Sequence, residues 1–301
     1  ATPLTRLGPD DPARFGALST RAFIPSVFAG IDIVPEKSWV NVAWSRTVAR
    51  PTFHEFLPIE SVAQDTGNLR RGNPDLTETS IENMDAAFEW AFSESTTAGF
   101  SLFRKRLMEP IVVVERSDQG VSTNTYINGD TGLINGLEIE GKWKSQKTPF
   151  TLQGNYTFID SLLKYKVNQG IEVTNLETRF PFQPGQILNL TLGWEPTELP
   201  WSAFLTTNFT DEYPTILRSD PVGYDVWLKP QFTLDLIVAR KFDLDWFQGT
   251  LTMGVKNLTN SLREYEYRGG TSGGNGGLLE GITYTSEEPG TSYSIEFKAA
   301  F

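Results

Sequence analysis

The chain contains no cysteine and only one histidine, His54, among its 301 residues. Disulfide bridges and thiolate catalysis are therefore excluded within this chain, and so is a zinc site built from cysteine and histidine ligands. The chain also has no apolar run that approaches the roughly 18 residues needed by a transmembrane helix. We expect neither a disulfide-stapled domain nor a bundle of membrane helices.

An excess of positive charge is absent as well. The chain has 37 acidic and 26 basic residues, which give a formal net charge of −11. An acidic chain repels a phosphate backbone, so we expect no nucleic-acid partner. Ala1–Asp11 lacks the basic-then-apolar pattern of a signal peptide, and we expect the chain to begin within a longer protein.

A strict alternation of apolar and polar residues is the dominant pattern that is present, and it is typical of β-strands with one apolar face. Seven segments show it clearly: Asn83–Phe92, Gly136–Lys144, Phe150–Phe158, Leu188–Trp194, Phe232–Val238, Thr250–Lys256 and Ser292–Phe301. Four segments show it more weakly: Ile24–Val34, Ser38–Val48, Thr96–Leu107 and Trp201–Asp211. We therefore expect eleven strands and no convincing helix, the nearest helical candidate being Leu57–Ala63.

The connections between these strands alternate in length along the whole chain. The short ones are Pro35–Lys37, Ser93–Ser95, Ser145–Pro149, Glu195–Pro200 and Phe242–Gln248. The long ones are Ala49–Thr79, Met108–Gly132, Asp160–Gly185, Glu212–Lys229 and Asn260–Gly290. An up-and-down barrel of the bacterial outer membrane has short periplasmic turns at one rim and long extracellular loops at the other. A Greek-key sandwich has no reason to sort its connections in this way.

Strand length and aromatic placement support a transmembrane barrel. Strands that cross a membrane need about 9–11 residues, and interfacial aromatic residues flank them. Tryptophans stand near strand ends: Trp39, Trp90, Trp143, Trp194 and Trp201. If the apolar faces meet lipid, the opposite faces line a wet lumen. The predicted lumen-facing residues are Glu138, Glu140, Lys142, Lys144, Asp235 and Glu296.

The fold class that we predict is all-β, an antiparallel up-and-down transmembrane β-barrel with about eleven strands present. A sheet in hydrocarbon must close, because every backbone polar group has to be paired within the protein. Single-chain bacterial barrels have even strand numbers, so an odd number indicates a fragment.

Four short stretches resemble one known family. They are Ser45–Phe53 (SRTVARPTF), Gly72–Leu76 (GNPDL), Asn135–Glu138 (NGLE) and Val255–Asn260 (VKNLTN). In this order and spacing, and with an alternating aromatic strand at the C-terminus, the chain resembles the TonB-dependent outer-membrane receptors from about Phe23 onward.

The resemblance implies a barrel of 22 strands whose lumen is filled by an N-terminal plug domain. Residues 23–301 would then be the C-terminal half of the barrel and residues 1–22 the remnant of an extracellular loop. The plug, with the TonB box that contacts TonB, would lie outside this chain. The family imports a scarce ligand (siderophore-bound iron, cobalamin, haem, a glycan or a peptide) with energy relayed from the inner membrane.

The resemblance also implies partners and a location. The location is the bacterial outer membrane, and the partners are its lipid, TonB through the plug, and the barrel-assembly machinery. The C-terminal strand would carry the assembly signal, although an ordinary edge strand is the alternative. The residues of this signal are Tyr293, Ile295, Phe297 and Phe301.

Charged and aromatic residues in the long connections are candidates for ligand capture. The strongest group alternates charge with aromatic rings: Arg263, Tyr265, Glu266, Tyr267 and Arg268. Weaker candidates are Asp211, Glu212, Tyr213, Arg70, Arg71 and His54. The alternative is that the first group simply extends a hairpin beyond the membrane.

Catalytic patterns are weak. Gly270–Gly274 matches G-x-S-x-G, yet it lies in a glycine-rich run without the helix that a nucleophile elbow requires. Glu138 and Glu140 are about 6.6 Å apart on one strand face, but Lys142 and Lys144 on the same face favour a solvated wall over a glycosidase pair. We expect no enzyme, no cofactor and no metal site. A small or oligomeric porin and a soluble β-rich surface binding module remain alternative functions.

Overall fold

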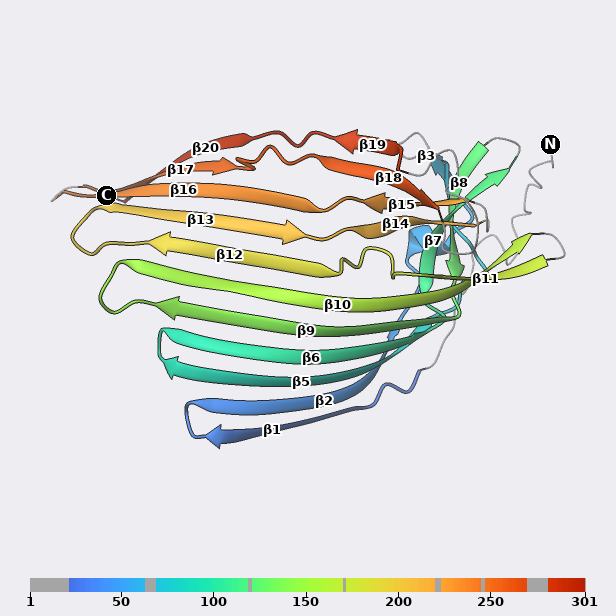
Figure 1. Ribbon diagram of the computed structural model, residues 1–301, viewed down its shortest axis with the longest axis horizontal. Coiled ribbons are helices and arrows are strands. Elements are labelled where there is room, and N and C mark those ends of the chain that lie inside the picture. Colours follow the sequence, from blue (N-terminus) through green and yellow to red (C-terminus); the bar gives the residue numbers. More distant parts are fainter. Residues whose placement is uncertain are drawn as a thin grey trace.

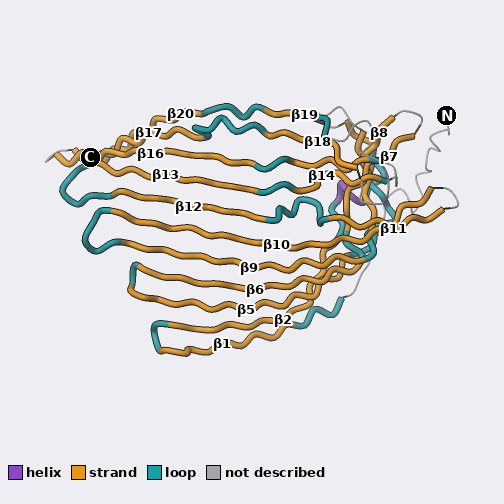
Figure 2. The backbone as a smooth tube through the Cα atoms, viewed as in Figure 1, coloured by secondary structure: helices purple, strands orange, loops and turns teal. Residues whose placement is uncertain are grey.

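The computed structural model describes residues 22–62, 69–118, 121–169, 172–219, 223–244, 247–269 and 281–300. Within these ranges the chain forms strands, turns and one short helix, α1 (Phe53–Phe56) (Figures 1 and 2). No helix in this part of the chain is long and apolar enough to cross a membrane.

The main sheet contains the eleven predicted strands in chain order. Each pairs antiparallel with the next, and β11 (Glu172–Thr178) pairs with β10 beside this path. The strands are β1 (Ser26–Val34), β2 (Ser38–Ala49), β5 (Thr79–Ser93), β6 (Thr96–Met108), β9 (Thr131–Lys144), β10 (Phe150–Gln169), β12 (Gln186–Trp194), β13 (Trp201–Thr210), β16 (Gln231–Leu244), β17 (Phe247–Lys256) and β20 (Ser292–Ala300). The predicted up-and-down order is confirmed.

Short turns and long connections lie at opposite ends of this sheet (Figure 1). A short connection does lie within the predicted range Phe242–Gln248, but the predicted bounds are too wide, because β16 continues to Leu244 and β17 begins at Phe247. The rings of Phe242 and Phe247 lie 6.4 and 5.8 Å from the ring of Phe297 on β20. This aromatic packing extends the hairpin past the predicted turn.

The long connections are not plain loops, and this was not predicted. They form a second sheet in the order β19-β18-β15-β14-β7-β8-β4-β3, in which the pairs β14–β7 and β4–β8 are parallel. Its strands are β3 (Glu60–Val62), β4 (Leu69–Arg71), β7 (Ile111–Asp118), β8 (Val121–Asn128), β14 (Tyr213–Arg218), β15 (Tyr224–Leu228), β18 (Arg263–Gly269) and β19 (Thr283–Glu287). Figure 1 shows it at the end of the main sheet opposite the short turns.

The short helix α1 ends just before the segment Leu57–Ala63, where the sequence offered its nearest helical candidate. That candidate is wrong, because Leu57 is extended and β3 occupies Glu60–Val62. Pro58 disfavours a helical conformation at the residue before it. The helix starts earlier because Thr52 and Glu55 form a capping box, in which the backbone N–H of Thr52 donates to Glu55 Oε2 at 2.7 Å.

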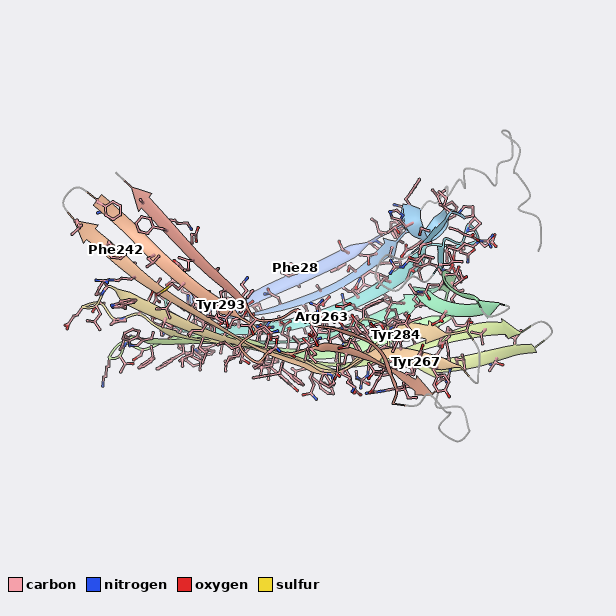
Figure 3. All side chains as sticks on the ribbon, turned by 90° about the horizontal axis from the view of Figure 1, so that it is seen from above. Phe28, Phe242, Arg263, Tyr267, Tyr284 and Tyr293 are labelled. Carbon is pink, nitrogen blue, oxygen red and sulfur yellow. The ribbon has the colours of Figure 1, made fainter. Side chains whose placement is uncertain are left out.

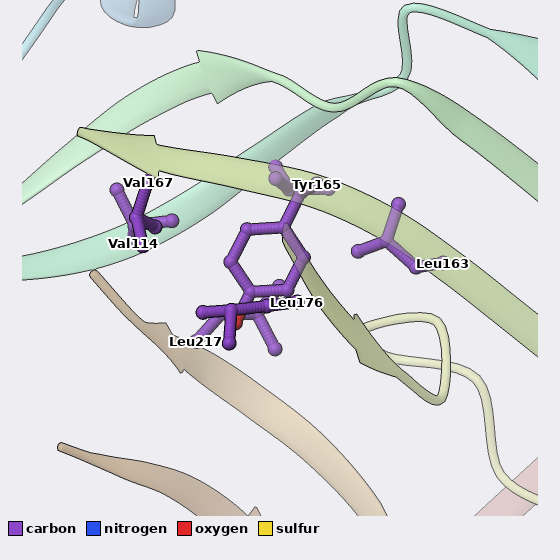
Figure 4. Packing of buried hydrophobic residues seen from close by; sticks show 7 residues of the cluster. Val114, Leu163, Tyr165, Val167, Leu176 and Leu217 are labelled. Carbon is purple, nitrogen blue, oxygen red and sulfur yellow. The ribbon is translucent and has the colours of Figure 1, made fainter. Parts of the chain in front are cut away.

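The principal core lies between the second sheet and the outer part of β10, where it pairs with β11 (Figure 4). Its buried side chains are Val112, Val114, Leu163, Tyr165, Val167, Leu176 and Leu217. The Tyr165 hydroxyl donates to the carbonyl of Arg218 at 3.2 Å, so this buried polar group is satisfied. The core fastens the connections to the main sheet.

A smaller core on the main sheet adjoins the principal core. Leu107, Ile134 and Ile159 are buried there, with Ile81, Phe103 and Phe180 packed against them. Phe180 also contacts the principal core. The Phe103 ring lies over Gly136, where an added Cβ would come within 2.0 Å of its Cζ. The two cores are therefore continuous through Phe180.

The main sheet is curved and strongly twisted. In Figure 3 its edge strands β1 and β20 slope in opposite directions, as the twist of a β-sheet requires. The sheet is open, since β1 and β20 are its two edges.

Candidate functional site

Opposed residues of antiparallel strands point to the same side, so the register divides the main sheet into two faces. One row across the sheet is almost entirely polar: Trp39, Glu89, Gly99, Glu140, Asn155, Asn189, Asn208 and Thr233. The neighbouring row on the other side is apolar: Val40, Phe88, Phe100, Ile139, Tyr156, Leu188, Phe209 and Phe232. The sheet thus has a polar face and an apolar face.

The six residues predicted to face a lumen all lie on the polar face. Glu138, Glu140, Lys142 and Lys144 alternate along β9, and Lys142 is linked by register through Gln153, Thr191 and Thr206 to Asp235 on β16. Glu296 on β20 is opposite Thr252 of β17, which is opposite Ala239 on the same side of β16 as Asp235. That this face lines a lumen stays a prediction.

Trp39 departs from the predicted aromatic belt. It is opposite Glu89, so it lies on the polar face and not with Trp90, Trp143 and the other apolar residues. The reason is the alternation of β2, which places Val40, Val42 and Trp44 on the apolar side.

The polar face is hollowed near the short turns. A depression of about 380 Å³ is lined by residues that include Trp39, Glu89, Glu140 and Lys142. Gly99, between the two glutamates in the row, adds no side chain to it. Both signs of charge and the amides of neighbouring asparagines meet here. Such a surface suits water and polar groups.

The apolar face is exposed over much of its area. Large exposed side chains on it include Phe92, Phe100, Leu102, Ile139, Trp143, Phe150, Leu152, Phe158, Leu190, Leu192, Leu205 and Phe232. On β20, Tyr293 and Ile295 are each 78% exposed, and Phe297 is also exposed. Phe301, the last residue of the predicted assembly signal, lies outside the described residues. An apolar surface of this extent must be covered by something other than water.

A charged cluster joins three long connections at the second sheet. Arg268 on β18 lies 2.7 Å from Glu212 and 2.6 Å from Glu266. Its guanidinium also lies 4.9 Å from the centre of the Trp227 ring on β15, a cation–π distance. Lys229 lies 3.5 Å from Glu266. The predicted capture residues Arg268, Glu266 and Glu212 are thus brought together.

The electrostatics of this cluster are those of a satisfied ion-pair network. The hydrogen bond from Arg268 lowers the pKa of Glu212 below its ordinary value, although burial opposes this. The same bond holds the pKa of Arg268 above its ordinary value. Arg179 adds a hydrogen bond to the Glu212 carbonyl at 3.0 Å and an ion pair to Asp211 at 4.0 Å. Internal charges therefore balance one another here.

Two of the three tyrosines among the capture candidates, Tyr267 and Tyr213, pack against other rings. Tyr267 contacts Tyr224 and Tyr284 edge to face, with ring centres 5.9 and 5.1 Å apart (Figure 3 labels Tyr267 and Tyr284). Tyr213 lies 6.4 Å from the Phe182 ring. Burial raises the pKa of both Tyr213 and Tyr267, so both phenols are neutral at physiological pH.

Two further members of the candidate group, Arg263 and Tyr265, lie at the start of β18. Arg263 lies 3.7 Å from Glu287 on β19 and Tyr265 pairs with Leu228 on β15. These pairings agree with the alternative that the segment extends a hairpin. Ligand capture by these residues stays a prediction.

His54, Arg70 and Arg71, which the sequence placed in separate segments, line one pocket of about 540 Å³. Phe53, Leu57 and Ile59 contribute apolar surface, and Tyr126 on β8 also lines the pocket. Burial raises the pKa of Tyr126, with the Glu55 carboxylate acting in the same direction and Arg70 opposing it. Sequence reasoning missed Tyr126 because the strand that carries it lies inside a connection with no predicted structure.

Gly72 allows the two segments that border this pocket to approach each other closely. An added Cβ there would lie 1.9 Å from the Leu57 carbonyl oxygen, so only glycine lets β4 approach the turn after α1. Asn73 then donates its backbone N–H to the Glu55 carbonyl at 2.7 Å and its side-chain amide to the Tyr126 carbonyl at 2.8 Å. Phe53 and Gly72, which belong to two of the stretches that carry the family resemblance (Ser45–Phe53 and Gly72–Leu76), both line this pocket.

No group of three or more histidine, aspartate or glutamate residues in the described ranges could hold a metal ion. The G-x-S-x-G match with Ser272, and the glycine-rich run around it, lie outside those ranges.

Comparison with known proteins identifies the family. The family model described as "TonB dependent receptor-like, beta-barrel" matches residues 5–258. A search of curated protein sequences gave no significant match.

Solved structures show the same fold at low sequence identity. A ferric enterobactin receptor from Pseudomonas aeruginosa superposes with a TM-score of 0.59 at 16% identity, covering 92% of this chain and 40% of that one. The siderophore receptor PirA from Acinetobacter baumannii gives a TM-score of 0.56 at 15% identity, with 92% and 40% covered. The copper transporter OprC gives 0.58 at 14% identity, with 91% and 38% covered.

The chain therefore spans about 40% of the length of the receptors that it resembles. The two-faced sheet, with its turns and connections sorted to opposite ends, agrees with the family match over most of the sequence. The chain belongs to the TonB dependent receptor-like β-barrel family.

Proposed function

We propose that this chain forms part of the barrel wall of a receptor that imports a scarce ligand across the bacterial outer membrane, with energy relayed through TonB. The observation that carries the proposal is the two-faced sheet whose connections form a structured layer at one end only. Membership of the family supports it. Transport, not chemical conversion of the ligand, is the proposed activity.

The apolar face would contact lipid and the polar face would line the lumen. Alternation of this kind along every strand is the arrangement of an outer-membrane barrel. The open edges β1 and β20 need partners in hydrocarbon, because unpaired backbone groups are strongly unfavourable there. We propose that residues 23–301 form the C-terminal half of a barrel of 22 strands and that residues 1–22 belong to an extracellular loop. A plug domain in the same protein would fill the lumen and contact TonB.

The ligand would be met first at the end that carries the second sheet. The names of the similar structures mention ferric enterobactin, siderophores and copper, and these ligands are those of the named proteins. For this chain the ligand class is siderophore-bound iron, cobalamin, a glycan or a peptide.

The last strand would also serve assembly of the barrel. Tyr293, Ile295 and Phe297 point to the exposed side of edge strand β20, and Phe301 continues the alternation in the sequence. Such a strand is suited to recognition by the barrel-assembly machinery.

Uptake in cells tests the transport proposal. The natural full-length protein would be expressed in a host that lacks its own receptors, and accumulation of ⁵⁵Fe-loaded siderophores, cobalamin and labelled glycans would be measured. We expect accumulation of one of these ligands that needs both this protein and a functional TonB. Equal accumulation in cells without TonB would indicate a passive pore instead, and accumulation of none of the ligands would contradict import of these classes.

A further inference from the structure

Three arginines stand on the apolar face of the main sheet, at the end that carries the long connections. Arg46 of β2 is opposite Glu82 of β5, and Glu82 is opposite Arg106 of β6. Arg104 precedes Arg106 by two residues, so both of their side chains lie on the same side of β6 as Phe100. All three arginines are exposed. This arginine group (Arg46, Arg104 and Arg106) therefore borders the surface that is proposed to contact lipid.

The guanidiniums of the arginine group are not held by carboxylates. Within the described ranges, none of the three forms an ion pair or a side-chain hydrogen bond. The nearby Arg50 differs, because it lies 3.7 Å from Glu78. The register places Glu82 between two of the arginines, but its carboxylate accepts a hydrogen bond from the indole N–H of Trp44 at 3.1 Å. The arginine group is thus available to an anion from outside the sheet.

The balance of charge at this edge of the apolar face is positive. A second carboxylate, that of Asp160 on β10, is separated from Arg104 by Asn135 of β9. Two strand spacings of about 4.8 Å put the backbones of Asp160 and Arg104 about 10 Å apart. Three guanidiniums against two carboxylates give an excess of positive charge, although the whole chain has a net charge of −11.

The height of the arginine group matches the edge of a hydrocarbon layer. Phe92, at the short-turn end of β5, and Glu82 are ten residues apart in the same strand. At about 3.3 Å per residue this is about 33 Å along the strand. A strand tilted by about 40° then rises about 25 Å, the height of the apolar band of an outer-membrane barrel. The arginine group therefore lies where the hydrocarbon ends and the lipid headgroups begin.

The surface beside the arginine group suits acyl chains. Four side chains on the same face of β2, β5 and β6 are large, apolar and exposed: Val42, Met84, Phe100 and Leu102. Met84 is directly opposite Arg104, so the change from cationic to apolar surface is abrupt. A molecule that fits such a surface has an anionic headgroup and apolar chains.

We infer that the arginine group binds the phosphate groups of a lipid in the outer leaflet, whose acyl chains cover the neighbouring apolar surface. This inference rests on the proposed contact of the apolar face with lipid, and it adds a specific headgroup site to that contact. Guanidinium groups donate charge-assisted hydrogen bonds that match the geometry of phosphate oxygens. Clusters of basic residues beside a membrane also attract anionic headgroups over a longer range.

Native mass spectrometry of the natural full-length protein in detergent tests the inference. The probes are bisphosphorylated lipid A and the same lipid after removal of both phosphates. We expect the wild-type protein to bind the dephosphorylated lipid about tenfold or more weakly, because the ion pairs with the arginines are lost. A variant that combines Arg46→Gln, Arg104→Gln and Arg106→Gln should bind both lipids equally, at the level of the wild type with the dephosphorylated lipid.

Arg240→Gln is the matched control. Arg240 is also exposed on the apolar face, but it lies at the end of the short turns, opposite Trp201. Its guanidinium lies 5.1 Å from the centre of the Trp201 ring and 4.9 Å from that of Phe242. This variant removes one exposed arginine from the same face and should retain the preference of the wild type for the phosphorylated lipid.

Equal binding of the two lipids by the wild-type protein would overturn the inference, and this comparison needs no variant to fold. Unchanged binding in the triple variant, or an equal loss in Arg240→Gln, would overturn it as well. Displacement of lipid A by inorganic phosphate at the same concentration would indicate a site for a free anion and would contradict the assignment to a lipid.

The lipid-binding assay needs no TonB, so its result is separate from the uptake assay. TonB-dependent uptake by a protein that binds the two lipids equally would remove the lipid site and leave the import proposal standing. Phosphate-dependent binding of lipid A by a protein that takes up none of the ligands would support the lipid site and contradict import.

Discussion

The Arg268 guanidinium lies 2.7 Å from the Glu212 carboxylate, although 56 residues separate the two in the chain. Arg268 comes from β18, and Glu212 from the connection that follows β13. Their contact joins two hairpins at the end of the main sheet. The long connections are thus held to one another as well as to the strands from which they emerge.

The stability of the second sheet should decrease in acid because of Glu212. Its pKa lies below the ordinary 4.5, chiefly because Arg268 donates a hydrogen bond to it. A group with a lowered pKa contributes stability that is present above the unfolded value and is lost as the pH falls through the folded one. We expect amide exchange in β18, corrected for its intrinsic pH dependence, to speed up below about pH 4.5. Glu212→Gln should remove this acid-dependent part, and an unchanged profile in the variant would contradict the assignment.

Asp225 should act in the opposite direction. Burial raises its pKa above the ordinary 3.8, although the backbone hydrogen bond from Arg218 at 2.9 Å opposes the shift. Its contribution is therefore present below pH 3.8 and is lost as the pH rises through the raised value. In the wild-type protein, amide protection in β14 and β15 should therefore decrease as the pH rises above 3.8. Asp225→Asn should abolish this decrease, and amide exchange in the two strands measures it. If Asp225→Asn changes the pH profile of amide exchange in the same sense as Glu212→Gln does, the predicted direction of the Asp225 contribution is wrong.

The principal core should be sensitive to truncation. Leu217 is fully buried between β7, β10 and β11, and replacing a buried leucine by alanine destabilises a protein by about 2–5 kcal/mol. We expect Leu217→Ala to lower the exchange protection of the second sheet while leaving β16 and β17 protected. Leu205→Ala, on the exposed apolar face, is the control and should change protection little. Equal effects of both variants would mean that the core does not fasten the second sheet.

Gly72 should tolerate no side chain. The clash at 1.9 Å is with the Leu57 backbone, so no rotation of a side chain can relieve it. We expect Gly72→Ala to displace α1, to break the hydrogen bond from Asn73 to Glu55 and to increase proteolysis within residues 53–59. At Gly141 the nearest atom to an added Cβ is 3.5 Å away, so Gly141→Ala should be accepted. Similar proteolysis of the two variants would contradict this account of the pocket.

The strands of the main sheet could be predicted because each separates two environments. Phe88 and Trp90 alternate with Glu89, and Ile139 with Glu138 and Glu140, so the period of two is visible in the sequence itself. The alternation of short and long connections then indicated that strands consecutive in the chain are neighbours in the sheet. Where an aromatic pair such as Phe242 and Phe297 continues the packing, the turn could not be located from alternation alone.

The second sheet could not be predicted, because its signals are not local. Ile111–Val114 is a continuous apolar run whose burial depends on Leu217 and Tyr165, which are distant in sequence. The parallel pairing of Leu217 with Val114 joins two different connections. For the same reason His54 and Arg70 were separate candidates until the fold brought them into one pocket.

The most direct test of the central claim is a cysteine scan along β9 in the membrane-embedded full-length protein. This chain has no cysteine of its own, so each introduced residue from Leu137 to Trp143 can carry a nitroxide label. If the apolar face meets lipid and the polar face a wet lumen, collisions with oxygen should be high at positions 137, 139 and 143, and collisions with a water-soluble nickel complex should be high at 138, 140 and 142. Accessibility without this period of two, or an aqueous environment on both faces, would contradict a barrel wall in the membrane.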